Sequence, residues 1–176
     1  MKRILPLLWL LPTLALATPL RDLDGRPADL REWIGQGRWT VVMIWSWDCP
    51  ICNREVEAWD LFDDAHRDRD ARVIGLSING GGEEAKARAF VEEHDLGFPS
   101  LIGTARQVDA LLRRETGQGL RGTPTFLLYD PEGRPVGMQI GPLPTEAVEE
   151  ILRRHDGRHE TGASPVQRPA RDGGMG

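Results

Sequence analysis

The chain contains very little cysteine, because Cys49 and Cys52 are the only two among its 176 residues. A disulfide-stapled scaffold needs several cysteines spread along the chain, and a bridge across two intervening residues removes little unfolded-state entropy. A structural zinc site needs four ligands, and no second cysteine pair is present to complete one. The scarcity of cysteine leaves two interpretations, a redox-active pair or two thiolates that hold copper(I).

Apolar segments long enough to cross a membrane are also missing. The longest run, Ile4–Leu16, is shorter than the roughly 20 residues that a span needs, and two prolines interrupt it. Two basic residues precede it, and it ends in the small-x-small pattern Ala15-Leu16-Ala17, which is typical of a secretory signal peptide. We expect residues 1–17 to be a cleaved signal peptide, with an uncleaved anchor as the alternative. The mature protein would then be soluble in the periplasm or another exported compartment.

Basic residues are also fewer than acidic ones. Removal of residues 1–17 leaves 20 basic against 27 acidic residues, a net charge of −7. An acidic exported chain is a poor candidate for binding nucleic acid or an anionic membrane surface. We therefore expect no nucleic-acid partner.

The cysteines lie where a strand pattern changes to a helix pattern. The run Val41–Trp45 is apolar without alternation, which is typical of a strand buried on both faces, and we expect it to be the central strand. From residue 49 to about residue 67 the apolar spacing is helical, with Cys52, Val56 and Trp59 on one stripe. The pair is therefore predicted at the start of a helix that follows a buried strand.

The remaining segments predict a single α/β domain over residues 18–154. Asp24-Gly25 is a strong hairpin turn near the N-terminus. Further along, the patterns predict strands at residues 72–80 and 98–103, helices at 83–94 and 105–114, two strands around a turn at 130–133, and a last helix. This order favours a mixed central sheet flanked by helices. Residues 155–176 are polar and rich in glycine, proline and arginine, so we expect a disordered tail there.

The position of the pair favours redox chemistry. At a helix N-terminus, unpaired backbone N–H groups and the helix dipole stabilise a thiolate, so we expect Cys49 to be the exposed nucleophile. Cys52 lies one turn further and is expected to be the buried resolving thiol. The disulfide would itself be the redox group, so no separate cofactor or metal is expected, although copper(I) binding stays open.

Three motifs accompany the cysteines. The buried strand ends in Trp-x-x-x-Cys-Pro-x-Cys-x-x-Glu, D-L-D-G-R-P precedes it, and G-T-P-T-F-L-L-Y-D-P-E-G follows about 70 residues later. With this combination the chain resembles the TlpA/ResA group of exported thioredoxin-fold proteins over residues 19–154. The resemblance implies a thioredoxin fold with an N-terminal hairpin and a central insertion from Gly81 to about Gln118.

The resemblance also implies residues that bind substrate and assist catalysis. Thr123–Pro124 would be a cis peptide bond facing the cysteines, which only proline tolerates readily, and an ordinary trans proline is the alternative. The backbone of Thr123 could then pair with an extended substrate, and Trp47 would lie beside it. Glu55 shares the stripe of Cys52, where a carboxylate either titrates high or has a catalytic role, unless it turns to solvent.

One departure from the family concerns the residue before the first cysteine. Relatives usually have tryptophan there, whereas this chain has Asp48 with Trp47 one place earlier. A carboxylate beside Cys49 opposes ionisation of the thiol, unless Asp48 serves as the N-cap of the helix. We expect Asp48 to modulate the pair, together with Pro50 and Ile51 between the cysteines.

The sequence as a whole predicts an exported thiol:disulfide oxidoreductase. The resemblance implies a reductant of dedicated client proteins with cysteine pairs, in cytochrome c maturation or copper-site assembly, with electrons from a membrane partner. Two alternatives use the same cysteines: a copper(I) chaperone and a DsbA-like oxidant.

Overall fold

A computed structural model describes residues 19–162 of the chain. The predicted signal peptide, residues 1–17, and the last part of the predicted tail, residues 163–176, lie outside this range. Within residues 19–162, none of the helices combines the length and the apolar character that a membrane crossing requires.

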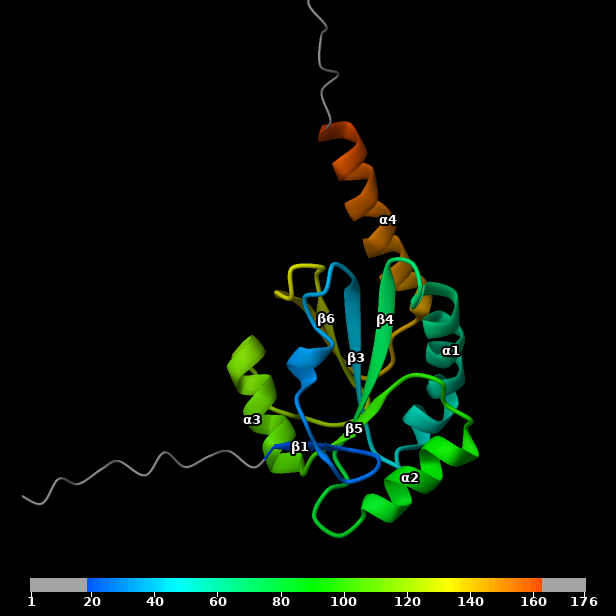
Figure 1. Ribbon diagram of the computed structural model, residues 1–176, viewed down its shortest axis with the longest axis vertical. Coiled ribbons are helices and arrows are strands. Elements are labelled where there is room, and N and C mark those ends of the chain that lie inside the picture. The colour runs from blue at the N-terminus through cyan, green and yellow to red at the C-terminus, as the bar shows by residue number, and fades with distance from the viewer. Residues whose placement is uncertain (1–18, 163–176) are drawn as a thin grey trace, which may run out of the picture.

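A mixed sheet forms the centre of the described chain (Figure 1). It has seven strands there, in the order β2-β1-β5-β4-β3-β6-β7. β3, β4 and β5 run parallel, whereas β1 pairs antiparallel with β5, and β6 and β7 continue antiparallel from β3. The strands are β1 (Leu20–Asp22), β2 (Pro27–Ala28), β3 (Trp39–Trp45), β4 (Ala71–Ser77), β5 (Ser100–Ile102), β6 (Thr125–Tyr129) and β7 (Pro135–Ile140).

Helices cover both faces of the sheet (Figure 1). In the described range they are η1 (Leu30–Glu32, a 3-10 helix), α1 (Pro50–His66), α2 (Glu84–Glu93), α3 (Ala105–Thr116) and α4 (Thr145–Gly162). Side chains of β3 alternate between the faces: Met43 and Trp45 pack with residues of α1, α2 and α4, while Val42 and Ile44 pack with residues of η1 and α3. Two apolar layers therefore hold the sheet between the helices, as the sequence predicts.

The hairpin and the insertion are both present. β1 and β2 pair across the turn at Asp24-Gly25, where Gly25 adopts a φ of +84°. α2, β5 and α3 lie between β4 and β6, and β5 adds its strand beside β4. The hairpin then pairs with β5, so three strands lie on the far side of β4. For this reason β4 is the middle strand, and the expectation that Val41–Trp45 is central is wrong by one position.

The last helix is longer than the sequence predicts. α4 continues to Gly162 and so extends into residues 155–176, where a disordered tail was expected. Leu152 is buried, and Glu150 forms ion pairs with Arg153 and Arg154. Such pairs, spaced three and four residues apart, stabilise a helix without any packing partner.

Candidate active site

The cysteine pair begins α1 at the carboxyl end of β3. Cys49 is the N-cap residue, with an extended backbone, and its sulfur accepts a hydrogen bond of 3.1 Å from the backbone N–H of Cys52. Pro50 occupies the first turn, where its missing N–H leaves no hydrogen bond unmade. The expectation that Asp48 caps the helix is therefore wrong. Its exposed carboxylate instead accepts a hydrogen bond from the Ser46 hydroxyl.

The two cysteines form a disulfide in this structure. Their Cα atoms are 5.2 Å apart. Cys49 exposes 8% of its surface and Cys52 none. Cys49 is thus less exposed than the sequence suggests, because it packs into the same apolar cluster as Cys52. Cys49 is nevertheless the more exposed cysteine of the pair.

The Thr123–Pro124 bond is cis, as predicted. Thr125 pairs with Ile44 in the antiparallel ladder between β6 and β3, so Pro124 lies at the sheet edge where β3 ends and α1 begins. Pro124 is buried, and Thr123 is half-buried. Within the described chain, the backbone of Thr123 makes no hydrogen bond. An extended segment that approached this edge would find free backbone groups there.

Asn79 fixes the loop before Cys49, and sequence reasoning missed it. This residue is 6% exposed and follows β4. Its Oδ1 accepts hydrogen bonds from the Trp47 N–H at 3.1 Å and the Ser77 hydroxyl at 3.0 Å, and its Nδ2 donates to Ser46 Oγ at 3.0 Å. The available signal was a polar residue directly after a buried strand at the same sheet edge. Asn79 therefore joins the ends of two strands through hydrogen bonds made by both its amide oxygen and its amide nitrogen.

Asn53 holds the same loop from the helix side. Its Nδ2 donates to the carbonyl oxygens of Trp47, at 3.2 Å, and Cys49, at 2.9 Å. Its Oδ1 lies 3.1 Å from His94 Nε2. Since the Asn53 amide nitrogen already donates, its oxygen is the acceptor and His94 carries a proton on Nε2. The first turn of α1 is thereby tied to the end of α2.

Trp47, predicted to bind substrate, packs against α2. The ammonium group of Lys86 lies 4.4 Å from the centroid of the Trp47 ring, and Lys86 also pairs with Glu83 at 2.7 Å. Hydrogen bonds from Lys86 and Asn79 lower the pKa of Glu83. The half-buried indole is thus held at the rim of the pair by a charged residue of the insertion.

Glu55 lies on the inner side of α1, so the alternative of a solvent-facing side chain is wrong. Burial raises the pKa of its carboxyl, partly offset by a hydrogen bond from the backbone of Leu143 and by the charge of Arg54. The buried Oε2 has no hydrogen-bond partner among the described residues. The structure therefore holds a carboxyl whose pKa is raised by burial, one turn along the helix from Cys52.

An apolar rim surrounds the disulfide. Pro50 is exposed, while Ile51 and Leu143 are partly buried and pack against the cluster that contains both cysteines. In residues 19–162 no group of three or more His, Cys, Asp or Glu side chains is arranged to hold a metal ion. A copper(I) ion bound by two thiolates would not require such a group, so that alternative stays open.

Comparisons with known proteins place this arrangement in a family. Residues 11–134 match the AhpC/TSA family. The thiol-disulfide oxidoreductase ResA of Bacillus thuringiensis is 23% identical over 133 residues, which are 76% of this chain and 71% of the relative. Alkyl hydroperoxide reductase C of Mycobacterium tuberculosis is 30% identical over 123 residues, 66% of this chain. The chain spans only 61% of that reductase.

Solved structures confirm the fold. A thiol:disulfide interchange protein of the thioredoxin family from Chlorobium tepidum superposes with a TM-score of 0.63. It is 19% identical in sequence, and the match covers 78% of this chain and 93% of the other. The predicted thioredoxin fold is therefore correct.

Proposed function

The chain belongs to the AhpC/TSA family and resembles ResA within it, and from this premise we propose that it is an exported thiol:disulfide oxidoreductase. One observation carries the proposal above the others. A disulfide lies at the start of α1 with Cys49 reachable and Cys52 fully buried, at the edge that also holds the cis Pro124. This is the geometry that divides attack and resolution between two thiols.

The reaction exchanges one disulfide for another. In the reduced protein, the Cys49 thiolate attacks a substrate disulfide, forms a mixed disulfide and releases one substrate thiolate. The Cys52 thiolate then attacks the Cys49 sulfur, which forms the Cys49–Cys52 disulfide and releases the second substrate thiolate. Two electrons pass to the substrate, and the backbone N–H of Cys52, which points at the Cys49 sulfur, stabilises the attacking thiolate.

Glu55 has the properties of a general base for resolution. Cys52 is buried, so its proton has no direct path to bulk water. A carboxyl whose pKa is raised by burial is a better proton acceptor than an ordinary glutamate and lies one turn away. In this role Glu55 takes the Cys52 proton as the mixed disulfide resolves.

Substrate binding uses the edge around Thr123 and Pro124. The free backbone groups of Thr123 pair with an extended substrate segment, which sets a substrate cysteine against Cys49. Trp47 and Ile51 supply apolar contacts on either side. The substrates in this proposal are client proteins with cysteine pairs, reduced during cytochrome c maturation or copper-site assembly. A membrane-bound donor then returns electrons to the Cys49–Cys52 disulfide.

Trapping of intermediates tests the proposal. In the Cys52→Ser protein a client should remain attached to Cys49 as a stable mixed disulfide that reductant releases, because the resolving thiol is absent. Cys49→Ser is the matched control and should trap nothing. Trapping by Cys49→Ser alone would reverse the two roles, and trapping by neither would reject the proposal.

The reduction potential of the Cys49–Cys52 couple decides whether the protein reduces or oxidises its substrates. A reductant should have a potential near that of thioredoxin, about −270 mV, whereas a DsbA-like oxidant would lie near about −120 mV. Equilibration of the Cys49–Cys52 couple with glutathione buffers measures it. Titration of the reduced protein with copper(I) tests the chaperone alternative, which requires one tightly bound ion per cysteine pair.

Peroxide reduction is a second candidate, favoured by the similarity to alkyl hydroperoxide reductase C. The Cys49 thiolate would attack the peroxide oxygen, release the alcohol and become a sulfenic acid. Cys52 would then displace water and close the disulfide. Consumption of cumene hydroperoxide by the reduced protein, with Cys49→Ser as the control, separates this candidate from disulfide exchange.

A further inference from the structure

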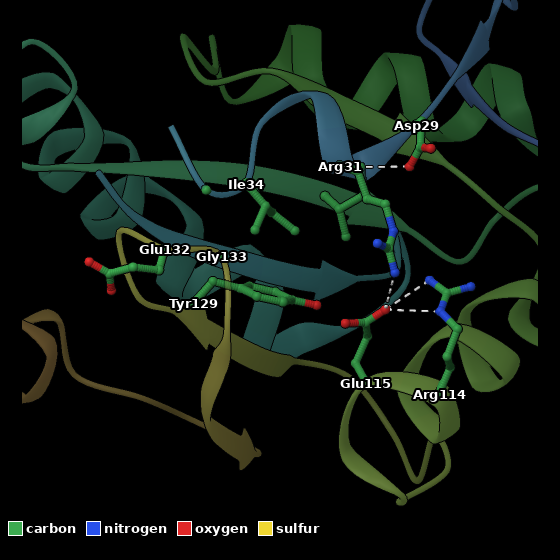
Figure 2. Close-up of a pocket in the computed structure, with 10 residues that line it drawn as sticks. Asp29, Arg31, Ile34, Arg114, Glu115, Tyr129, Glu132 and Gly133 are labelled. Carbon is green, nitrogen blue, oxygen red and sulfur yellow. Dashed lines mark hydrogen bonds and ion pairs between the residues drawn. The ribbon is translucent and has the colours of Figure 1, made fainter. Parts of the chain in front are cut away.

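A second site lies at the opposite end of β6 from the cysteines. A cavity of about 360 Å³ is lined there by Tyr129, the last residue of β6, by the start of η1 and by the end of α3 (Figure 2). The first residue of the strand, Thr125, pairs with Ile44 close to the disulfide. At about 3.3 Å per residue, four residues of strand separate the two ends by roughly 13 Å. The cavity is therefore not part of the redox site.

The hydroxyl group of Tyr129 is buried without a hydrogen bond. The residue is 1% exposed, and its hydroxyl has no partner among the described residues. Burial, followed by the negative charge of Glu115, raises its pKa far above the ordinary range, so the group stays protonated and can donate. Figure 2 shows the hydroxyl end of the ring directed toward Glu115 and the side chain of Arg31. A buried donor of this kind needs an acceptor, and the cavity is where one could enter.

Two guanidinium groups share a single carboxylate oxygen beside this hydroxyl. Arg114 contacts Glu115 Oε1 at 2.9 Å through both Nε and Nη2, and Arg31 Nη2 lies 3.6 Å from the same oxygen. Each guanidinium has five N–H donors, and the Arg31 and Arg114 side chains are 69% and 60% exposed. Most of their donors therefore remain available at the mouth of the cavity.

The other acidic residues of the cavity have partners of their own. Asp29 accepts a hydrogen bond of 2.9 Å from the backbone N–H of Arg31, as the cap of η1. Glu132 pairs with Arg134 at 3.1 Å. Neither carboxylate is thus paired with the two guanidinium groups. Among the lining residues Glu115 is the one carboxylate that contacts Arg31 and Arg114, while Asp29 adds a second negative charge to the wall. An entering anion would therefore bind to the guanidinium N–H donors that Glu115 does not use.

We propose that this cavity binds a small organic carboxylate with a short apolar group. Its carboxylate accepts hydrogen bonds from the Tyr129 hydroxyl, Arg31 and Arg114, as a second anion beside Glu115. Its apolar group lies against Ile34, which is half-buried and lines the same cavity. The volume is at the small end of the range for ligand pockets, about 300–1,000 Å³, so the ligand is small. Most of the wall is polar, and the contact with Ile34 favours such a ligand over inorganic phosphate.

The single tyrosine of the chain gives a direct probe. Protein with ¹³C-labelled tyrosine shows one tyrosine ring resonance, from Tyr129. Titration of the oxidised protein with sodium butanoate should shift this resonance to saturation, acetate should bind more weakly, and chloride at equal ionic strength should cause no saturable shift. An absence of saturation with any carboxylate, or equal shifts with chloride, would overturn the proposal. Because the disulfide stays oxidised throughout, the outcome does not depend on the redox function.

Neighbouring arginines of α3 provide a matched pair of variants. Arg114 and Arg113 are similarly exposed, at 60% and 63%, and each pairs with one carboxylate, Glu115 and Asp109 respectively. Only Arg114 lines the cavity. Arg114→Gln should raise the Kd for butanoate about tenfold, the loss of one charge-assisted hydrogen bond, while Arg113→Gln should leave it within about twofold. Equal losses in both variants would indicate unspecific attraction to positive charge and contradict the site.

Tyr129→Phe separates binding from folding. Phenylalanine keeps the ring in place and removes only the hydroxyl that lacks a partner, so the free protein should unfold at the same urea concentration or a higher one. Butanoate binding, followed through the backbone amide of Gly133 at the cavity wall, should weaken about tenfold. Unchanged binding in this variant would show that the hydroxyl takes no part and would overturn the proposal.

Discussion

Near each end of α1 lies a carboxyl group whose pKa is raised by burial, and the two groups have different surroundings. Near the last turn, Asp63 is 2% exposed and accepts a hydrogen bond of 2.7 Å from the backbone N–H of Val73 in β4. Arg67 adds a charge 3.6 Å away. Nearer the start of the helix, Glu55 also has a backbone hydrogen bond, from Leu143, but its Oε2 is buried with no partner in the described chain. The same direction of pKa shift therefore accompanies an anchored group at one end and an available one at the other.

This difference distinguishes a buried carboxyl group that holds the structure together from one that can take part in proton transfer. A fully buried carboxylate such as Asp63, which accepts a backbone hydrogen bond from a neighbouring strand and pairs with an arginine, is held in one place, and its removal leaves that N–H without an acceptor. A carboxyl with an unpartnered oxygen can gain and lose a proton at little structural cost. One helix is thus anchored to β4 near its end by Asp63, and near its start it holds a carboxyl with an unpartnered buried oxygen, which is the group proposed to accept the Cys52 proton.

Removal of the anchored carboxylate should give the largest change in stability. Asp63→Ala leaves the Val73 N–H buried without an acceptor, so the free energy of unfolding should fall by about 1–3 kcal/mol. Urea unfolding of the oxidised protein measures this loss. The reduction potential of the cysteine pair should stay unchanged, because Asp63 lies at the other end of α1.

Asp64→Ala is the control for this variant. Asp64 is next in the chain, its side chain is 50% exposed, and it pairs with the same Arg67. An exposed ion pair contributes less than about 1 kcal/mol, so this variant should be nearly neutral. Similar losses in both variants would mean that Asp63 acts through Arg67 and not through Val73.

Glu55→Gln should act on kinetics more than on folding. If Glu55 accepts the Cys52 proton, resolution of the mixed disulfide should slow by about a hundredfold, at the low end of what a general base contributes. Stopped-flow fluorescence with a small disulfide substrate, at several pH values, follows this step. Glu57→Gln, an exposed site on the same helix, is the control. An unchanged rate and pH profile would remove Glu55 from the reaction.

The raised pKa of Glu55 also fixes the sign of its effect on stability. The folded protein retains the Glu55 proton at pH values where the unfolded chain has lost it, above the ordinary pKa of 4.5. The contribution of this group to stability is therefore present at low pH and falls as the pH rises through the folded pKa. The stability of Glu55→Gln relative to the unmodified protein should increase from about pH 4 to about pH 8. The opposite slope would contradict the burial of this carboxyl.

Local sequence patterns were sufficient to predict those parts of the site that depend on a single segment of the chain. The uninterrupted apolar run Val41–Trp45 and the helical stripe that follows it predicted β3 and α1, and family resemblance supplied the cis Pro124. The cap of α1 could also have been predicted. Proline favours the first helical position, so Pro50 made Cys49, and not Asp48, the better candidate for the N-cap.

Contacts between segments that are distant in the sequence could not be predicted from local patterns. The hydrogen bond from Trp47 to Asn79 joins residues 32 positions apart, and only the pairing of β3 with β4 brings them together. Asp63 falls on the apolar stripe, four residues after Trp59, which could have marked it as buried. Its partner Val73, however, follows from the packing of α1 on β4. Strand order was likewise unpredictable, because it depends on where β5 and the hairpin join.

The smallest predicted effect concerns Asp48, whose carboxylate is exposed and bonded to Ser46. It is next to Cys49, so its negative charge opposes ionisation of that thiol, but water screens an exposed charge. Asp48→Asn keeps the hydrogen-bond acceptor and should lower the Cys49 pKa in the reduced protein by less than about one unit. Ultraviolet thiolate absorbance against pH measures the change.

Asp68→Asn completes the comparison between the two ends of α1. Asp68 is an exposed aspartate just beyond the last turn, so its replacement removes the same charge far from the cysteines and should leave the Cys49 pKa in place. If both variants lower the Cys49 pKa equally, the effect is one of net charge. If Asp48→Asn raises it or leaves it unchanged, the bond to Ser46 matters more than the charge, and the aspartate positions the loop before Cys49 without tuning its ionisation.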